Sequence, residues 1–120
     1  MQQAAVAYPE PVLQLREVLD TYLEPDQVAL VLRAYEVAEK AHRGQTRKTG
    51  EPYIFHPVAV AMILANLRMD HKSIAAAILH DTIEDTRLSW NDIEQSFGNE
   101  IADLVEGVTK LDKMKFRTRV

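Results

Sequence analysis

Two almost entirely apolar runs, separated by only a few residues, constrain this chain more than any other feature. VAVAMILANL occupies residues 58–67 and IAAAIL occupies residues 74–79. Neither run shows the strict apolar–polar alternation of a half-buried strand. A helix that is apolar on nearly all sides is buried within a protein rather than amphipathic. We therefore predict two buried helices, one starting with Pro57 in its first turn and one running from Lys72 to His80.

Apolar residues recur at helical spacing along most of the remaining chain. Pro25 is suited to the first turn of a helix, and Ser89, with Asp92 three residues later, forms an approximate capping box for another helix. Phe97–Gly98 ends that helix. The prediction is an all-α fold whose helices comprise residues 11–22, 25–41, 57–67, 72–80, 90–97 and 100–108, with a glycine- and threonine-containing loop at 42–53.

The composition limits what this helical chain can bind. Its 120 residues are enough for one domain, and it has no cysteine, so His, Asp and Glu must supply any metal ligands. The net charge of −4 provides no global basic field, so we do not expect DNA as a partner. We find neither a signal peptide nor an apolar run of membrane-spanning length, and we expect a cytoplasmic protein without a membrane partner.

The second apolar run ends in a polar cluster, LHDTIEDT, at residues 79–86. His80 and Asp81 lie about 100° apart on a helix, and at a helix end both can face one cation. His56 stands just before the first buried helix, and packing of the two helices can bring it to the same point. Two imidazoles and one carboxylate suit Mn²⁺, Fe²⁺ or Zn²⁺ better than Ca²⁺ and leave positions open for water and substrate. The competing interpretation is structural, with Asp81 stabilising a turn and His80 hydrogen-bonded in the core.

Two further acids follow this pair. Glu84 lies four residues after His80, and Asp85 lies four residues after Asp81, so continued helical turns would point both toward the same opening. A carboxylate at that position can orient an attacking water or accept its proton. So many ionisable groups in six residues would repel one another unless a cation sits among them. The alternative is that both are ordinary surface acids at the start of a loop.

The predicted loop carries basic residues just upstream of His56. Arg47 can stack on a base and pair with phosphate, whereas Lys48 is a point charge for phosphate. With His42 and Arg43, they would form a cationic loop opposite an acidic metal site, which suits a phosphorylated substrate. The alternative is a solvated basic loop without a ligand.

Three segments in this order resemble a known family. AHRGQTRKTGEPYIFHP (41–57), AAILHDTIEDT (76–86) and FGNEIADLVEGVTKL (97–111) are similar to the hydrolase domain of the RelA/SpoT homologues, enzymes of (p)ppGpp metabolism within the HD-domain phosphohydrolase superfamily. The likeness spans roughly residues 25–112 and is greatest to the bifunctional SpoT/Rel type, because the H…HD…ED series is intact. The resemblance implies an HD-domain helical bundle that removes the 3′-pyrophosphate of ppGpp or pppGpp, releasing GDP or GTP and pyrophosphate.

The resemblance also implies roles for individual residues. It implies that His56, His80 and Asp81 bind Mn²⁺. It implies that Glu84 and Asp85 serve the attacking water. It also implies a nucleotide-contacting loop, with Arg47 against the guanine, Lys48 near the phosphates and Thr49 as a small hydroxyl residue.

One part of the family pattern is missing before Val120. The family's fourth metal ligand is an aspartate in a later segment resembling KLADRLHNMRT. We therefore expect an N-terminal piece of a longer protein, with an N-terminal helix region at 1–24 and the first part of an HD hydrolase domain at 25–120, its bundle incomplete at the C-terminus. The whole protein would add synthetase, TGS and ACT-type regulatory domains. Apolar surface left bare would favour a homo-oligomer.

Two other functions stay open at this point. One is an HD phosphohydrolase that acts on a different nucleotide, such as a dNTP or a cyclic nucleotide, although the RKTGEPY loop favours (p)ppGpp. The other is a non-catalytic helical module that binds a nucleotide or a partner protein.

Overall fold

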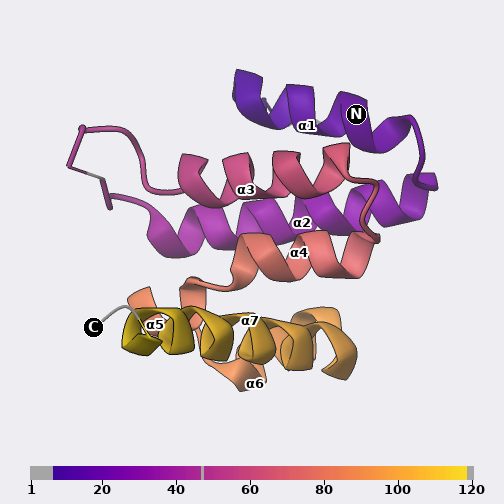
Figure 1. The fold of residues 1–120 in the computed structure, drawn as a ribbon. Coiled ribbons are helices and arrows are strands. Elements are labelled where there is room, and N and C mark those ends of the chain that lie inside the picture. The colour runs from indigo at the N-terminus through magenta and orange to yellow at the C-terminus, as the bar shows by residue number, and fades with distance from the viewer. Residues whose placement is uncertain (1–6, 47, 119–120) are drawn as a thin grey trace, which may run out of the picture.

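Helices make up nearly all of the regular structure in the computed structural model of this chain (Figure 1). It describes residues 7–46 and 48–118, with the side chains of these residues except 84, 85 and 111–118. The described part forms α1 (Glu10–Asp20), α2 (Pro25–His42), α3 (Phe55–Asn66), α4 (His71–Leu79), α5 (Thr82–Asp85), α6 (Trp90–Phe97) and α7 (Asn99–Thr118). It contains no strand, apart from an isolated bridge between Thr46 and Pro52. The all-α prediction is confirmed.

Helix α4 lies at the centre of the molecule and packs against α2, α3 and α7 (Figure 1). Each residue of its apolar run, 74–79, is buried, as the sequence predicts. Asp70 caps its first turn, because one carboxylate oxygen accepts a hydrogen bond from the Ser73 backbone N–H at 3.0 Å. Three neighbouring helices therefore fix the orientation of α4 and the position of the residues that follow its C-terminal end.

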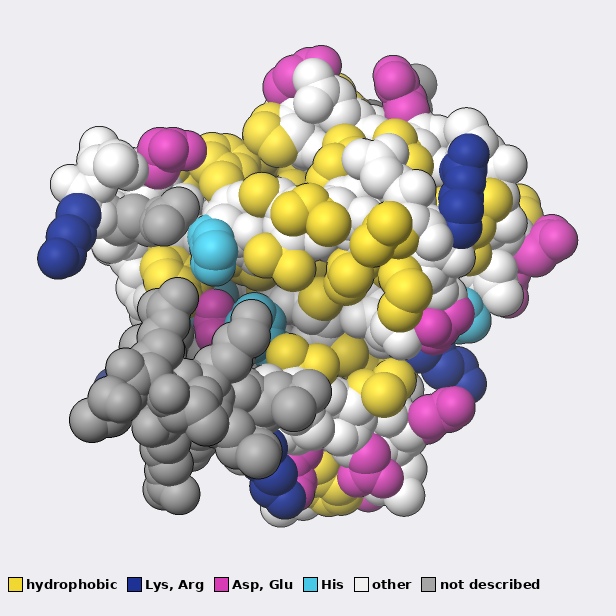
Figure 2. Space-filling view, in the orientation of Figure 1, with side chains coloured by type: hydrophobic (Ala, Val, Ile, Leu, Met, Phe, Trp, Pro, Cys, Tyr) yellow, Lys and Arg dark blue, Asp and Glu magenta, His cyan; other side chains and the backbone are white. Residues whose placement is uncertain are grey.

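Helix α3 differs from its prediction. Val58, Ala61 and Ala65 are buried, but Ile63 is 61% exposed and Leu67 is 67% exposed. Helices α1 and α4 cover two sides of α3, and the described residues leave its third side uncovered. Figure 2 shows hydrophobic side chains gathered on this face of the molecule. The expectation that this helix is buried on all sides was therefore wrong.

The junction between α6 and α7 follows the sequence closely. The Ser89 hydroxyl accepts a hydrogen bond from the Asp92 backbone N–H, and Asp92 accepts one from the Ser89 backbone N–H, so the capping box is confirmed. Gly98 then adopts a φ of 93°, a left-handed conformation that favours glycine, and ends α6.

Helix α7 is longer than predicted. It continues past Val108 to Thr118, because the Leu, Lys and Met residues beyond Gly107 are strong helix formers. An ion pair between Lys110 and Glu106, one turn apart at 3.0 Å, supports this extension. Among the described residues, no helix is both long enough and apolar enough to cross a bilayer.

Candidate metal centre

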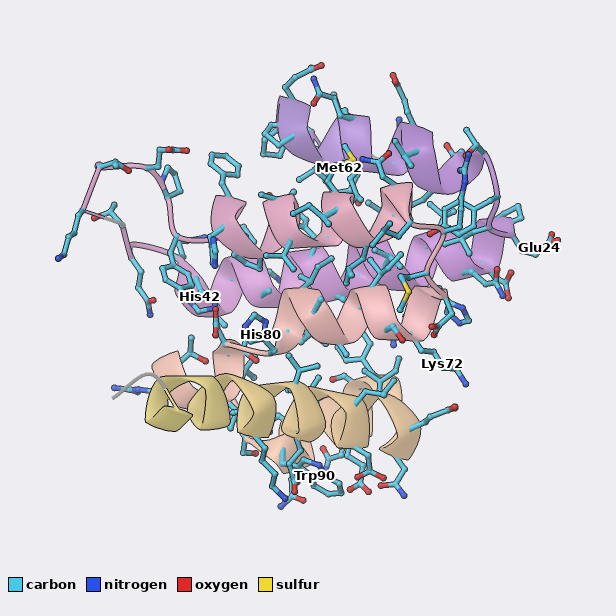
Figure 3. The ribbon with its side chains drawn as sticks, viewed as in Figure 1. Glu24, His42, Met62, Lys72, His80 and Trp90 are labelled. Carbon is cyan, nitrogen blue, oxygen red and sulfur yellow. The ribbon has the colours of Figure 1, made fainter. Side chains whose placement is uncertain are left out.

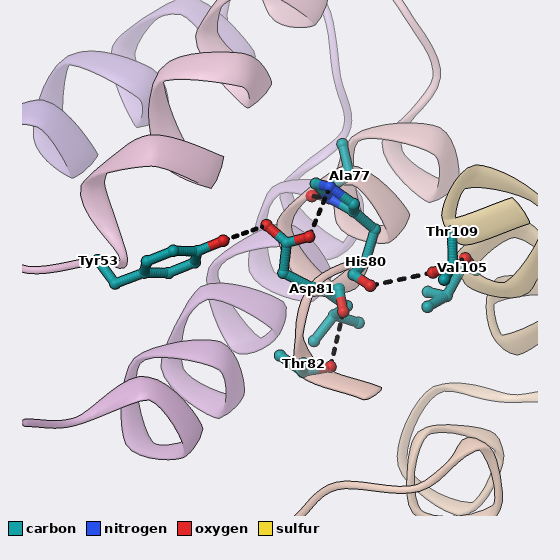
Figure 4. Close-up of polar contacts among 8 residues, drawn as sticks. Tyr53, Ala77, His80, Asp81, Thr82, Val105 and Thr109 are labelled. Atoms are coloured by element: carbon teal, nitrogen blue, oxygen red, sulfur yellow. Dashed lines mark hydrogen bonds and ion pairs between the residues drawn. The ribbon is translucent and has the colours of Figure 1, made fainter. Parts of the chain in front are cut away.

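The His80–Asp81 pair stands at the buried end of α4, where the chain turns into α5 (Figure 4). His80 is 9% exposed, and its Nε2 lies 3.0 Å from Oδ1 of Asp81. The Thr109 hydroxyl of α7 lies 3.0 Å from the His80 carbonyl oxygen and 2.9 Å from the Val105 carbonyl oxygen, and its one proton is shared between these two acceptors. This contact links the pair to a second helix. The structure therefore brings together the two residues that form the HD dipeptide.

The tautomer of His80 follows from its other ring nitrogen. Nδ1 lies 2.6 Å from the carbonyl oxygen of Ala77, which only accepts hydrogen bonds, so Nδ1 carries a proton. In a neutral imidazole, Nε2 then presents a lone pair toward Asp81. A lone pair and a carboxylate oxygen in contact require a proton or a metal cation between them.

Asp81 is held as a carboxylate by its neighbours. Burial raises the pKa of its carboxyl group. When His80 is protonated, its hydrogen bond and charge, with the Tyr53 hydrogen bond and the charge of His56, outweigh burial and lower that pKa below its ordinary value. The Tyr53 hydroxyl donates to Oδ2 at 2.8 Å. The ionised form that a metal needs is therefore the favoured form.

His56 lies near this pair, but it does not form a three-residue metal-binding group with His80 and Asp81. It is in the first turn of α3, half-buried, and its ring packs edge-on against Tyr53 with centroids 6.3 Å apart. Within the described ranges, no group of three or more His, Asp or Glu residues is close enough to hold a metal ion. The assignment of His56 as a third ligand stays a prediction.

The other predicted site residues belong to two segments. The α5 backbone includes Glu84 and Asp85, but their side chains lie outside the described residues, as does Arg47 entirely. Lys48 and Thr49 are exposed in the loop between α2 and α3, which extends away from the helices (Figure 1). The roles given to these five residues stay predictions.

Two residues that we counted as loop cations have other contacts at the end of α2. His42 is the last residue of α2 (Figure 3) and is only 2% exposed, because the helix runs one residue further than predicted. Arg43 forms an ion pair with Glu39 at 2.6 Å, so its charge is already matched. The cationic character of the loop therefore depends on residues 47 and 48.

Two residues around the pair escaped sequence reasoning. Tyr53 contacts Asp81, and Thr109 contacts the His80 carbonyl. Each lies far from the HD dipeptide in the sequence, and neither belongs to a residue type that metal-site patterns include at that spacing. The one available signal was the tyrosine in the GEPY segment next to His56.

A hollow of about 680 Å³ opens beside the start of the loop between α2 and α3. It is lined by Val37, Lys40, Ala41, Gln45, Thr86, Arg87 and Leu88. Lys40 and Arg87, with the Thr86 hydroxyl and the Gln45 amide, suit an anionic ligand. Among the predicted site residues whose side chains the structure describes, none lines it.

A helical bundle whose buried central helix ends in a His–Asp pair agrees with the comparison with known families. The family model described as HD domain matches residues 34–119, and the chain belongs to this family.

Individual relatives are also similar over most of the chain. It is 55% identical over 105 residues to the bifunctional (p)ppGpp synthase/hydrolase SpoT of Escherichia coli strain K12, covering 88% of this chain and 15% of that protein. It is 50% identical over 104 residues to a guanosine-3′,5′-bis(diphosphate) 3′-pyrophosphohydrolase of Aquifex aeolicus, covering 87% and 15%. A GTP pyrophosphokinase of Streptomyces coelicolor is 50% identical over 107 residues, covering 89% and 13%. The chain thus spans about 15% of the length of these relatives.

Proposed function

We propose that this chain is an HD-type hydrolase domain that holds Mn²⁺ and removes the 3′-pyrophosphate of ppGpp or pppGpp, within a bifunctional (p)ppGpp synthetase/hydrolase. The observation that carries the proposal is the pairing of His80 Nε2 with Asp81 Oδ1 at 3.0 Å on the buried end of α4. The names of the relatives from Escherichia coli and Aquifex aeolicus support the choice of substrate. In the whole protein, synthetase, TGS and ACT-type domains would accompany it.

The donor set fits a divalent ion. His80 Nε2 and Asp81 Oδ1 lie 3.0 Å apart, so one divalent cation could contact both donor atoms. An imidazole nitrogen and a carboxylate oxygen suit Mn²⁺, and His56 would be the third ligand. When bound, the ion would polarise the phosphoryl oxygen and neutralise developing charge.

The chain's own residues would then orient the substrate and move a proton. Lys48 would neutralise phosphate, Arg47 would lie against the guanine, and Thr49 would contribute a hydroxyl group in the same loop. Glu84 or Asp85 would accept a proton from the attacking water, whose oxygen bonds to phosphorus. The bond between this phosphorus and the ribose 3′ oxygen breaks. The 3′ oxygen is the leaving group; it takes up a proton and stays on GDP or GTP as a hydroxyl group, and the attacked phosphorus departs in pyrophosphate.

The test is the release of pyrophosphate from ppGpp, with MnCl₂, by the purified full-length protein to which this chain belongs. We expect Asp81→Ala to abolish release and to weaken Mn²⁺ binding, while its helical circular dichroism stays that of the wild type. Asp103→Ala is the control, because Asp103 is an exposed aspartate of α7. Wild-type activity in Asp81→Ala would contradict the ligand assignment. Absence of Mn²⁺-dependent release from the folded wild type would contradict the proposed reaction.

A second candidate is binding of a nucleotide or another anion without turnover. The hollow lined by Lys40 and Arg87 favours it, since it offers two cations outside the HD pair. Calorimetry with ppGpp and Mn²⁺ separates the candidates, because this one requires binding in the absence of pyrophosphate release.

A further inference from the structure

The two carboxylate oxygens of Asp81 have different partners (Figure 4). Oδ2 accepts a hydrogen bond from the Tyr53 hydroxyl at 2.8 Å, and Oδ1 lies 3.0 Å from His80 Nε2. Tyr53 belongs to the segment between α2 and α3 and is 28 residues away in the sequence. One oxygen is therefore tied to this segment, and only the other faces the histidine.

Tyr53 is itself held in place by the end of α2. Its ring stacks on the His42 ring with centroids 4.7 Å apart and planes at 29°, and its backbone N–H donates to the Gln45 carbonyl at 3.0 Å. His42 Nδ1 lies 3.1 Å from Gln45 Oε1. Rotation of the tyrosine would therefore break the stacking contact.

The buried position of His42 also calls for an explanation beyond packing. Its Nε2 is buried and has no hydrogen-bond partner among the described residues. Such a nitrogen lowers stability, since it has lost its contact with water. The ring nevertheless lies flat against Tyr53, which is the residue that contacts Asp81.

We propose that Tyr53 is a positioning residue that fixes the Asp81 carboxylate so that Oδ1 alone is presented to a metal ion. Stacking on His42 fixes Tyr53 in turn. This inference rests on the proposed function, in which His80 and Asp81 are metal ligands. Ligating carboxylates are commonly oriented by a hydrogen bond to the oxygen that does not bind the metal, and loss of such a partner weakens metal binding.

The effect of losing the hydroxyl group would fall on the metal rather than on the fold. The terminal torsion of an aspartate has a broad energy profile, so an untethered carboxylate can turn Oδ1 away from His80. His80 cannot follow it, because Nδ1 is committed to the Ala77 carbonyl. Tyr53→Phe keeps the ring that stacks on His42 and removes the hydroxyl group that donates to Asp81.

The experiment is a titration of the full chain with MnCl₂, in which free Mn²⁺ is followed by electron paramagnetic resonance. We expect Tyr53→Phe to weaken Mn²⁺ binding roughly 10-fold, with a melting temperature in the absence of metal that falls no further than in the matched control below. The matched control is Tyr8→Phe, which removes a tyrosine hydroxyl that donates to the Glu36 carboxylate at 2.9 Å. This control should bind Mn²⁺ as the wild type does.

A second measurement needs no metal. The ¹⁵N signal of His80 Nε2, which faces Oδ1 of Asp81, should shift in Tyr53→Phe and stay in place in Tyr8→Phe. Wild-type Mn²⁺ affinity in Tyr53→Phe, together with weakened binding in Asp81→Ala, would overturn this inference and leave the proposed function intact. Mn²⁺ binding that Asp81→Ala does not weaken would overturn both.

Discussion

Two isoleucines with very different surroundings illustrate how unevenly burial stabilises this molecule at the scale of residues. Ile78 of α4 is fully buried, with 0% of its surface exposed, whereas Ile63 of α3 is 61% exposed. A fully buried aliphatic side chain contributes about 1.5–3 kcal/mol relative to an exposed one. The free energy of unfolding therefore depends on the first residue far more than on the second.

We expect Ile78→Ala to lower the free energy of unfolding by about 2–5 kcal/mol, because it removes apolar side-chain atoms that are buried on folding and leaves a cavity in their place. The matched control, Ile63→Ala, should change it by no more than about 0.5 kcal/mol. Urea unfolding followed by circular dichroism measures both values. Equal losses in the two variants would contradict the burial of α4 described above.

At this scale the sequence predicts residues whose chemistry is local. His80 and Asp81 could be chosen because they are adjacent and follow a buried helix. Tyr53 and Thr109 could not, since their hydrogen bonds to the pair depend on how α3 and α7 pack. The exposure of Ile63 could not be predicted from the sequence either, because it depends on which helices cover α3.

At the scale of elements, α4 depends on the cap at its N-terminus. The Ser73 hydroxyl donates a hydrogen bond to the Asp70 carboxylate at 2.7 Å, and the Ser73 backbone N–H donates another. The hydrogen bond from the Ser73 side chain is the largest cause that lowers the pKa of Asp70 below its ordinary value. The cap therefore stabilises α4 in its ionised form.

We expect Asp70→Ala to lower the free energy of unfolding by about 1 kcal/mol at pH 7. Because the pKa is lower in the folded state, the stabilisation is complete above the unfolded value of about 3.9 and is lost as the pH falls through the folded value. Wild type and variant should therefore converge in urea unfolding at acidic pH. A constant difference from pH 7 to pH 2 would contradict the role of the ionised cap.

Helices whose ends are marked by a capping residue or a glycine were predicted correctly from the sequence, and helices without such marks were not. The capping box of α6 and the glycine after it placed that helix correctly. The four-residue α5 and the extension of α7 were missed, because the sequence around Thr82 and Lys110 has no cap or breaker that marks an end.

At the scale of the whole molecule, the candidate metal centre joins four parts of the chain. Asp81 and His80 lie at the end of α4, Tyr53 precedes α3, His42 ends α2, and Thr109 is on α7. An ion that binds this arrangement does not bind the unfolded chain equally well, so it stabilises the folded state.

We expect Mn²⁺ at about 100 times its dissociation constant to stabilise the folded chain by about 2.7 kcal/mol and to raise its melting temperature by about 10 °C. EDTA should reverse the shift, and Asp81→Ala should show none. Scanning calorimetry measures these changes. A shift of the same size in Asp81→Ala would place the ion elsewhere.

The all-α fold class could be predicted from the sequence, because helix periodicity is a local property. The uncovered side of α3 could not, because it depends on how α1 and α4 pack against that helix. Ile63, Leu67 and Met69 are exposed there, and self-association through this side stays a prediction. Sedimentation of the wild-type chain across a range of concentrations measures it.

The hydrogen bonds that hold the HD pair have a kinetic consequence. They join Tyr53 to Asp81 and Thr109 to His80, residues 28 and 29 positions apart, whereas each helix is built from neighbours. Helices form within about a microsecond, but contacts across such distances must wait for the intervening chain to close. The candidate centre is therefore complete only when α2, α3, α4 and α7 have docked, and capture of an ion would mark the end of folding.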